Sequence, residues 1–585
     1  MARTLKSITR ENIELLFSDL PTAVDEPELT PVYPTPPNTD PSSSAPTVTS
    51  TTVPLKTPST RESLDELKHD QRLVHDIVEQ QLLRRLNGIP TRQMLMLCLG
   101  EGGTGKSRVI QEITKTYEEH GAANRLSRTA TSGVAATLID GETLHSWLKV
   151  GIKGETGNEW MAAADKKKHQ IRVKKIANRY LLIIDECSML TLRMLMSVSQ
   201  LADYIRSKVR EGEESIGIPF GRLDVMLFGD FHQFPPIRVS GVGLYEQPRI
   251  ERDILGRNVY HQFQDVITLR EQMRVRDPEW LDMLQHLRRG ACTARHLELI
   301  HSITLTKPQC QIPDFKTHPW DKVVLITSRC QVRDIWNIEA LAQHCRTRGV
   351  RHFVASAEDT VGKKPPSIQD RVDIAKYEPK KLALSARVHL AEGMRVIVGV
   401  NIATEADIAN GTRGTIVEIR LDPREPPLVE NEQGRTILSY PPALILFRPD
   451  KTPRFQFGHG IPDGLVPITP TEKHFSAKVP DSHSIRVCRR QLALQPAYAF
   501  TDYKSQGQTL DSCIVDLAHP PDRGSHITPF AAYVALSRAQ CRDDIRILRD
   551  FDEKIFTTLP SIALEAEDKR LAALERKTRA KYAHF

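Results

Sequence analysis

The sequence predicts an α/β protein in which helices cover parallel sheets. From about residue 64 onward, short apolar runs recur, each followed by a Gly or Ser/Thr turn and then a helical pattern. The clearest runs are Met94–Leu99, Tyr180–Ile184, Val225–Phe228, Val323–Ile326, Arg395–Val398 and Ile514–Leu517. Such alternation is typical of parallel sheets. Because ligands of these sheets bind at the carboxyl ends of the strands, we look for functional residues there.

Length and charge set the frame for this fold. A chain of 585 residues predicts two to four domains, and its 40% hydrophobic content is enough to bury their cores. The 80 Lys and Arg residues against 73 Asp and Glu give a net charge of +7. This mildly basic balance permits a surface that follows nucleic-acid phosphates but does not require one.

Cysteine usage and the N-terminal residues indicate the cellular compartment in which the protein is expected. The nine cysteines are scattered without a Cys-x-x-Cys pair, which argues against a disulfide framework, structural zinc or an iron–sulfur cluster. No apolar run approaches the roughly 18 residues of a membrane span. The charged N-terminus has no apolar core, which excludes a secretory signal and leaves a mitochondrial transit peptide as a minor alternative. We expect a nuclear protein, with the mitochondrion as the alternative.

Composition divides the chain into regions. Residues 1–60 are predicted to be disordered, since 21–60 are dominated by Pro, Ser and Thr. A polar insertion is expected at about 148–179, and a small Pro-rich β subdomain at about 415–490. Residues 561–585 are charged with helical spacing, which predicts a solvated C-terminal helix.

The strongest motif is the glycine-rich segment that follows the first apolar run. It consists of Gly100, Glu101, Gly102, Gly103, Thr104, Gly105, Lys106 and Ser107, and a helical pattern follows it. Glycines allow backbone N–H groups to surround a phosphate, the lysine reaches the β- and γ-phosphates, and the Ser107 hydroxyl can ligate Mg²⁺. The segment predicts nucleotide binding without fixing the kind of nucleoside triphosphatase.

An acidic pair follows the second apolar run. Asp185 and Glu186 end the strand Leu181–Ile184, about 80 residues after the glycine-rich loop. An Asp there is suited to hold the Mg²⁺ shell, and a Glu is suited to take the proton from an attacking water. We therefore predict that these two carboxylates serve phosphate hydrolysis.

Three further residues are candidates for sensing the γ-phosphate. Gln233 lies in the segment Gly229–Pro236, which follows the apolar strand Val225–Phe228. Arg274 and Arg538 are expected to reach the nucleotide from the second half of the chain. Guanidinium groups stabilise the charge of a phosphoryl-transfer transition state. Single arginines more often form surface ion pairs, so both rest on the family pattern that follows.

In order and spacing, these motifs resemble the Pif family of superfamily-one, B-branch DNA helicases, in particular the versions carried by Helitron transposons. The resemblance covers about residues 64–550. Besides the motifs above, it rests on Asp70-Gln71, Thr131–Thr137, Thr143–Ser146, Pro219–Gly221, Asn410–Gly414, Ala497–Thr509 and Leu536–Ala539.

The resemblance implies two RecA-like domains, at 61–265 and 266–560, with a wedge in the first insertion and an SH3-like subdomain in the second. It implies an ATP-dependent 5′-to-3′ DNA helicase that uses ATP and Mg²⁺ on single-stranded and 5′-tailed duplex DNA, in DNA repair, recombination or telomere maintenance. Gln71 would read adenine, and Gln233 would sense the γ-phosphate. The implied strand contacts are Thr131, His145, Lys504, Ser505 and Gln506.

The chain departs from the family pattern at three places. Thr131-Ser132-Gly133 replaces the usual Pro-Thr-Gly and keeps a hydroxyl. Val275 follows Arg274 where the family has Gln, and Tyr503 stands where most members have His. A tyrosine there either stacks on a base or fills a core position.

Contacts with DNA have less support from the residues themselves. The basic run Lys166–Lys175 is more often a solvated face than a phosphate contact. Phe231, His232 and Phe234 would either stack on bases or pack behind the nucleotide site. Two other functions therefore stay open: a DNA-stimulated translocase that does not separate strands, and an inactive transposon-derived remnant.

Overall fold

A computed structural model describes residues 66–148, 170, 173–209, 218–236, 241–379, 382, 384–400, 402, 408, 410–450, 461–479, 484–519 and 527–584. The region predicted to be disordered (1–60) and most of the insertion at 148–179, with Lys166–Lys168, fall outside these ranges. Among the described helices, none has the length and apolar character needed to cross a membrane.

The first domain contains a six-stranded sheet in which every strand runs parallel to its neighbours, in the order β3-β2-β4-β5-β1-β6. Its strands are β1 (Leu95–Gly100), β2 (Leu126–Ala130), β3 (Glu142–Thr143), β4 (Leu181–Asp185), β5 (Asp224–Gly229) and β6 (Asp265–Leu269).

Both faces of this sheet are covered because alternate residues of each strand point to opposite sides. Met96, Ile183 and Phe228 pack with α3 (His69–Leu86), α4 (Lys106–Glu119) and α5 (Gly133–Leu138). Leu97, Ile184 and Leu227 pack with the helices of the other face, which are α6 (Leu144–Leu148), α8 (Leu192–Val209) and α9 (Glu251–Tyr260).

A second, separate parallel sheet follows in the order β19-β7-β20-β21. It consists of β7 (Val324–Thr327), β19 (Ala499–Phe500), β20 (Cys513–Asp516) and β21 (Ile545–Ile547). One face packs with α10 (Pro278–Arg288), α11 (Ala294–Ser302), α15 (Pro529–Leu536) and α16 (Lys554–Thr557), and the other with α12 (Cys330–Arg348). The short helix α14 (Asp502–Ser505) follows β19. The predicted α/β class with two RecA-like domains is confirmed.

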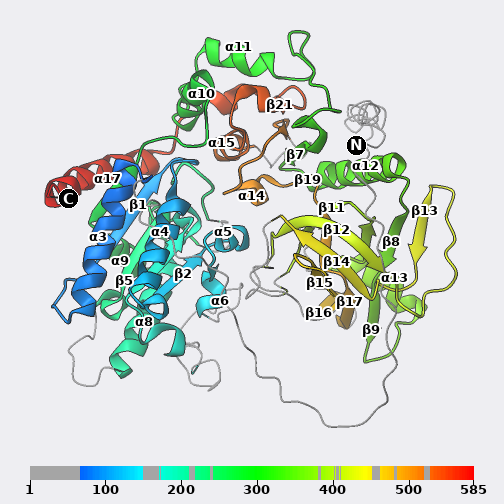
Figure 1. The fold of residues 1–585 in the computed structure, drawn as a ribbon, viewed down its shortest axis with the longest axis horizontal. Helices are drawn as coiled ribbons and strands as arrows, with labels where there is room; N and C mark the ends of the chain where they lie inside the picture. Colours follow the sequence, from blue (N-terminus) through cyan, green and yellow to red (C-terminus); the bar gives the residue numbers. More distant parts are fainter. Residues whose placement is uncertain are drawn as a thin grey trace.

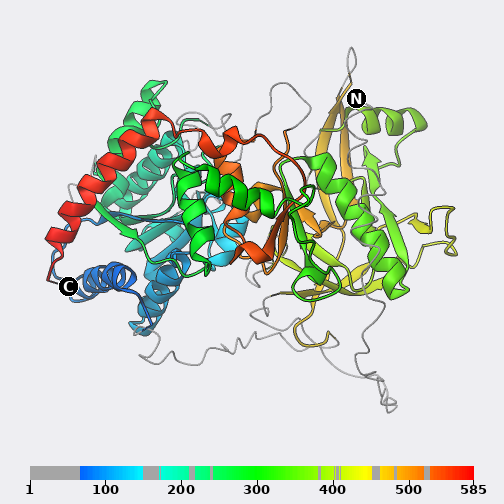
Figure 2. The ribbon, with the colours of Figure 1, turned by 90° about the horizontal axis from the view of Figure 1, so that it is seen from above.

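A β-rich region lies between β7 and β19 in the sequence and beside the second sheet in space (Figure 1). Its strands are β8 (His352–Ser356), β9 (Glu358–Val361), β10 (Arg387–Leu390), β11 (Arg395–Val398), β12 (Arg413–Arg420), β13 (Arg435–Leu438), β14 (Leu444–Pro449), β15 (Val466–Ile468), β16 (Thr471–Lys478), β17 (Ser484–Gln491) and β18 (Leu494–Pro496), with helix α13 (Ile368–Tyr377). Figure 2 shows the first domain at one end of the molecule and this region at the other.

Two expectations about this region need correction. Its strands begin at His352, well before the predicted residue 415. The run Arg395–Val398 is not a strand of a parallel sheet, because β11 pairs antiparallel with both β12 and β18. A short apolar run does not reveal the direction of its neighbours. The SH3-like character of the insertion stays a prediction.

The last helix, α17 (Ile562–Lys581), returns to the first domain and lies beside α3 (Figure 1). Leu564, Leu571 and Leu574 are buried in the core of that domain, so the expectation of a solvated helix is wrong. The hydroxyl of Thr578 accepts a hydrogen bond from the Val266 backbone N–H of β6 at 2.9 Å. The helix therefore covers the edge of the first sheet.

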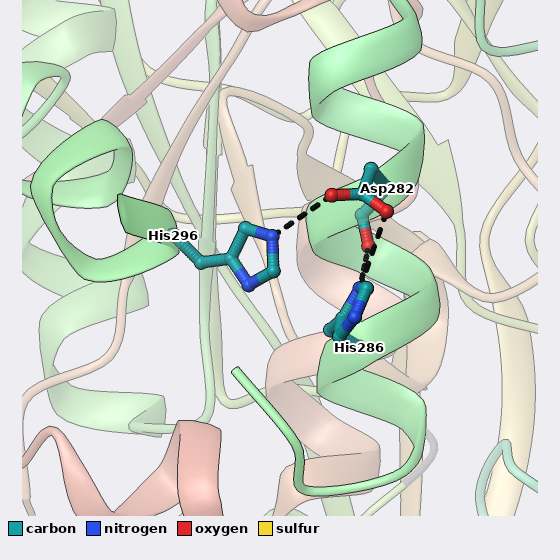
Figure 3. A group of neighbouring side chains, drawn as sticks. All are labelled: Asp282, His286 and His296. Carbon is teal, nitrogen blue, oxygen red and sulfur yellow. Dashed lines mark hydrogen bonds and ion pairs between the residues drawn. The ribbon is translucent and has the colours of Figure 1, made fainter. Parts of the chain in front are cut away.

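Asp282 and His286 of α10 lie beside His296 of α11 (Figure 3). Nδ1 of His296 accepts from the Thr293 backbone N–H at 3.1 Å, so Nε2 carries the proton and donates to Asp282 at 2.9 Å. In this tautomer Nε2 of His296 has no lone pair for a metal ion. The hydrogen bond between His296 and Asp282 therefore connects the two helices.

Short 3₁₀ helices complete the described part of the chain, at Ala123–Arg125, Cys187–Met189, Pro219–Arg222, Trp320–Lys322 and Arg542–Asp544.

Candidate nucleotide-binding site

A cavity of about 410 Å³ lies where the two parallel-sheet domains meet. The first domain and the connection that follows β6 supply Gly102, Gly103, Gly105, Lys106, Ser107, Gln111, Ala135, Leu138, Asp185, Glu186, Gln233, Met273 and Arg274. Gly507, Thr509, Arg538 and Gln540 come from the second domain. The cavity therefore gathers residues from the carboxyl ends of β1, β4, β5 and β6.

The loop after β1 needs its glycines because other groups approach them closely. Gly103 and Gly105 have φ angles of 98° and 84°, which side chains rarely tolerate. A Cβ on Gly105 would lie 2.3 Å from Nε2 of Gln71. Lys106 begins α4, and its ammonium donates to the carbonyls of Gly100 and Glu101 at 2.6 and 2.9 Å. The loop presents a cation and the N-terminus of a helix to the cavity, which together suit a phosphate group.

The two carboxylates after β4 are buried at the floor of the cavity. Burial, together with the neighbouring Glu186 charge, raises the pKa of Asp185 to about 7. Burial also raises the pKa of Glu186, which opposes the lowering by Lys106 and by the hydrogen bond from Gln506. A raised pKa is suited to a group that takes a proton near neutral pH.

The residues present fit the Mg²⁺ ion that the family implies. Ser107 and Asp185 both line the cavity and offer a hydroxyl and a carboxylate oxygen. Hard oxygen ligands of this kind are the ones Mg²⁺ prefers.

Gln233 reaches the cavity from the loop after β5. Its side-chain amide donates to Oδ2 of Asp230 at 3.2 Å, and both residues are buried. The amide nitrogen lies 3.8 Å from the position that a Cβ on Gly102 would occupy. Gln233 is therefore directed at the phosphate loop, as a γ-phosphate sensor requires.

Two arginines converge on the same glycine. The nearest guanidinium nitrogens of Arg274 and Arg538 each lie 3.3 Å from the Cβ position of Gly102. Arg538 is held by the backbone carbonyls of Val534 and Gln508 at 2.6 and 3.1 Å. Burial and the Arg274 charge lower the pKa of Arg538 to about 9. Two cations that approach the same glycine repel each other, so an anion between them would be stabilised.

Arg274 was expected to reach the nucleotide from the second domain, but it lies on the connection that follows β6. Its segment is bound to the phosphate loop, because the Met273 N–H donates to the carbonyl of Gly103 at 2.8 Å. The Arg274 guanidinium then donates to the carbonyl of Ser537 in the second domain at 3.1 Å. Arg274 therefore bridges the two domains.

Gln71, expected to read adenine, lies behind the phosphate loop. Its Nε2 donates to the carbonyl of Thr104 at 3.0 Å, and its Oε1 accepts from the Lys68 N–H at 3.1 Å. The adenine contact stays a prediction.

The residues implied as strand contacts occupy different environments. The Thr131 hydroxyl donates to the carbonyl of Glu186 at 2.9 Å, and Lys504 donates to Gln495 at 3.1 Å. Ser505 is fully buried, and Gln506 is buried against Glu186. His145 is partly buried, which lowers its pKa. Gln506 therefore faces the hydrolysis side of the cleft, whereas the Ser505 hydroxyl donates to the carbonyl of Asp502 at 2.6 Å; the strand contacts of both residues stay predictions.

The aromatic residues after β5 are core residues. Phe231 packs edge-on against Tyr245 and Tyr260, and Phe234 is buried beneath Tyr503, with ring centroids 4.1 Å apart and planes at 16°. His232 lies within hydrogen-bonding distance of the carbonyl of Arg288. Core packing is the role observed for Phe231 and Phe234, whereas the partly exposed His232 ring also lies 2.9 Å from the carboxylate of Asp568.

Sequence reasoning missed Gln272 and Arg288. Gln272 Nε2 donates to the carbonyl of Gly102 at 3.1 Å, and Arg288 forms a two-pronged ion pair with Asp230. Gln272 stands two positions before the predicted Arg274, and this closeness was the available signal in the sequence. Arg288 stands beside Arg289 with nothing in the sequence to separate them.

Comparisons with known proteins agree with this geometry. The model of the family described as PIF1-like helicase matches residues 66–297. The ATP-dependent DNA helicase PIF1 of Emericella nidulans is 28% identical over 494 residues, which cover 79% of this chain and 59% of that protein. The ATP-dependent DNA helicase RRM3 of Saccharomyces cerevisiae is 23% identical over 530 residues, covering 85% of this chain and 68% of that protein.

Solved structures share the fold. The Pif1 helicase of Candida albicans has a TM-score of 0.58 at 22% identity and covers 86% of this chain and 99% of that one. A Bacteroides Pif1 bound to single-stranded DNA has a TM-score of 0.57 at 18% identity, covering 86% and 96%. The chain is therefore similar to PIF1-like helicases, and its residues 66–297 match the model of that family.

Proposed function

We propose that the protein is an ATP-dependent DNA helicase that moves 5′-to-3′ on single-stranded DNA. The observation that carries this proposal is the cavity between the domains. It is lined by the six residues proposed to act on ATP: Lys106, Asp185, Glu186, Gln233, Arg274 and Arg538. ATP hydrolysis is the chemistry that this combination serves.

Each of these residues has a role that follows from its position. Lys106 binds the β- and γ-phosphates, and Glu186 accepts the proton of the attacking water. Mg²⁺, held by Ser107 and Asp185, would neutralise phosphate charge. Arg274 and Arg538 stabilise the charge that develops on the γ-phosphate, and Gln233 senses it.

The proposed movement on DNA depends on how the residues of the ATP site are distributed between the two domains. In the proposed division into domains at 61–265 and 266–560, with a C-terminal helix at 561–585, the phosphate loop and the acidic pair belong to the first domain and both arginines belong to the second. ATP would draw the domains together, and its hydrolysis would release them, so that they grip the strand in alternation. Thr131, His145 and Lys504 are the proposed strand contacts.

Partners and role are proposed from the relatives. Proteins named as DNA helicases match most of the chain, and one related structure holds single-stranded DNA. We propose single-stranded and 5′-tailed duplex DNA as the substrates, and a nuclear role in DNA repair, recombination or telomere maintenance. The resemblance to Helitron-carried members stays a proposal.

Strand displacement on a forked duplex tests this function. The wild-type protein should separate the strands with ATP, and Lys106→Ala and Glu186→Gln should not. Glu186→Gln should still bind ATP, because its amide removes the base and not the phosphate contacts. Hydrolysis stimulated by single-stranded DNA without strand separation would replace the helicase with a translocase. Absence of hydrolysis would favour the inactive remnant.

A further inference from the structure

Arg288, at the end of α10 in the second domain, enters the first domain and contacts two of its loops. Its two terminal nitrogens donate to the two carboxylate oxygens of Asp230 at 2.5 and 2.8 Å. Its Nε lies 3.5 Å from the carboxylate of Glu101 in the phosphate loop. The side chain is only 12% exposed. Buried two-pronged pairs of this kind fix geometry as well as charge.

Asp230 transmits this contact to the cavity. The carboxylate oxygen Oδ2 that accepts from Arg288 also accepts from the side-chain amide of Gln233 at 3.2 Å. The other oxygen accepts from the His232 backbone N–H at 3.1 Å. The orientation of the Gln233 amide therefore depends on a carboxylate that Arg288 holds in place.

The same guanidinium is tied to the second domain. It lies over the ring of Tyr533, 4.8 Å from its centroid. Tyr533 belongs to α15, whose last turn leads directly to Arg538. Arg288 thus contacts the phosphate loop, the support of Gln233 and the helix before Arg538 at once.

We infer that Arg288 is a positioning residue for ATP hydrolysis, which holds Asp230 and thereby orients the Gln233 amide when the two domains are together. This inference rests on the proposed ATPase function. In this role Arg288 of the second domain orients Gln233 of the first domain through Asp230. Arg274 and Arg538, by contrast, face the cavity directly. Separation of the domains would remove Arg288 from Asp230 and release Gln233.

The charge of Asp230 gives this role a measurable signature. Burial by itself would raise the pKa of Asp230, but the charge and hydrogen bonds of Arg288 hold that pKa well below its usual range. Without Arg288, burial would dominate and the carboxylate would take up a proton at higher pH. The other charged or titratable groups that interact with Asp230 or with its partner are His232, Lys106, Glu186, Cys187, Glu101 and Tyr533.

The test measures ATP hydrolysis, stimulated by single-stranded DNA, in Arg288→Gln and in the matched control Arg289→Gln. Arg289 is the neighbouring residue and is exposed. Arg288→Gln should lower kcat about tenfold or more while KM for ATP changes by less than about threefold, because orientation of the sensor matters most in the transition state. Arg288→Lys should recover only part of the rate, since an ammonium lacks the planar fork.

The pH profile distinguishes positioning from a structural role. From about pH 8.5 to about pH 6, kcat of Arg288→Gln should fall more steeply than that of the wild type, as Asp230 is protonated. Adding Asp230→Asn to Arg288→Gln should remove this extra slope. A variant that melts at lower temperature but keeps the wild-type kcat and pH profile would overturn the inference.

A double-mutant cycle covers the case in which Arg288→Gln alone does not fold. In the Asp230→Asn background no buried carboxylate is left unpaired, and Arg288→Gln should change kcat by less than about twofold if it acts through Asp230. A further tenfold loss would overturn the inference. A wild-type protein without hydrolysis would refute the proposed function and this inference together. An active wild type in which Arg288→Gln behaves as Arg289→Gln would refute this inference alone.

Discussion

The side-chain amide of Gln506 donates a hydrogen bond to Oε2 of Glu186 at 2.9 Å, although 320 positions separate them in the chain. Glu186 is the proposed base for hydrolysis, and Gln506 belongs to the segment after β19 in the second domain. The second domain therefore holds the carboxylate that would receive the proton.

Replacing Gln506 should slow hydrolysis without abolishing ATP binding. Gln506→Ala removes the donor that orients Glu186, and we expect kcat to fall roughly tenfold. The kcat of Gln506→Glu should be lower still, because this substitution places a second carboxylate beside the buried carboxylate of Glu186. DNA-stimulated ATPase assays and binding of a fluorescent nucleotide separate the two effects. Gln369→Ala, at an exposed glutamine of α13, is the control. Equal kcat values for Gln506→Ala and the control would contradict this role.

Arg538 should be required for the chemical step. Arg538→Ala removes a buried cation directed at the phosphate loop, and we expect kcat to fall about 10³-fold. Arg538→Lys keeps the charge but cannot reproduce contacts with both Val534 and Gln508, so it should recover only part of the rate. Thermal melting of each variant checks that the loss is not unfolding. A kcat of Arg538→Ala within threefold of wild type would exclude it as an arginine finger.

The stack of Phe234 on Tyr503 should help the domains to close. It joins the loop after β5 to α14, and such pairs contribute about 0.5–1.5 kcal/mol. Tyr503→Ala should therefore raise the DNA concentration for half-maximal ATPase stimulation by about 3- to 10-fold. Tyr503→Phe keeps the ring and should match wild type. If Tyr503→Phe is as defective as Tyr503→Ala, the hydroxyl and not the stack is what matters.

The helix α17 should stabilise the first domain through its contact with β6. Thr578→Val keeps the volume but leaves the buried Val266 N–H without its acceptor. We expect the free energy of unfolding to fall by about 1–3 kcal/mol, measured by chemical denaturation. Lys577→Ala, at an exposed position of the same turn, should cost less than about 0.5 kcal/mol. Equal stabilities of the two variants would show that α17 only covers the edge of the sheet.

The sequence predicted those parts of the site that local patterns encode. The glycine loop, the acidic pair after β4 and the glutamine after β5 each follow an apolar strand, so parallel-sheet geometry brings them together. Arg274 and Arg538 were found only through the family resemblance, because a single arginine has no local pattern.

Long-range contacts account for what the sequence did not predict. Arg288 differs from Arg289 through its long-range contacts with Glu101, Asp230 and Tyr533, of which Asp230 lies 58 positions earlier. The burial of Ser505 and of one face of α17 depends on surfaces that other parts of the chain supply. The start of the β-rich region was predicted at about residue 415, whereas its first strand β8 begins at His352. Strands β8 and β9 have no distinctive local pattern, and they pair with strands far along the chain, β13 and β17.

The most direct test of the central claim compares unwinding of two matched duplexes, one with a 5′ single-stranded tail and one with a 3′ tail. We predict ATP-dependent unwinding of the 5′-tailed duplex alone, lost in Lys106→Ala. Unwinding of only the 3′-tailed duplex would contradict the proposed direction of movement while leaving the ATPase site intact. Unwinding that persists in Lys106→Ala would contradict the site itself.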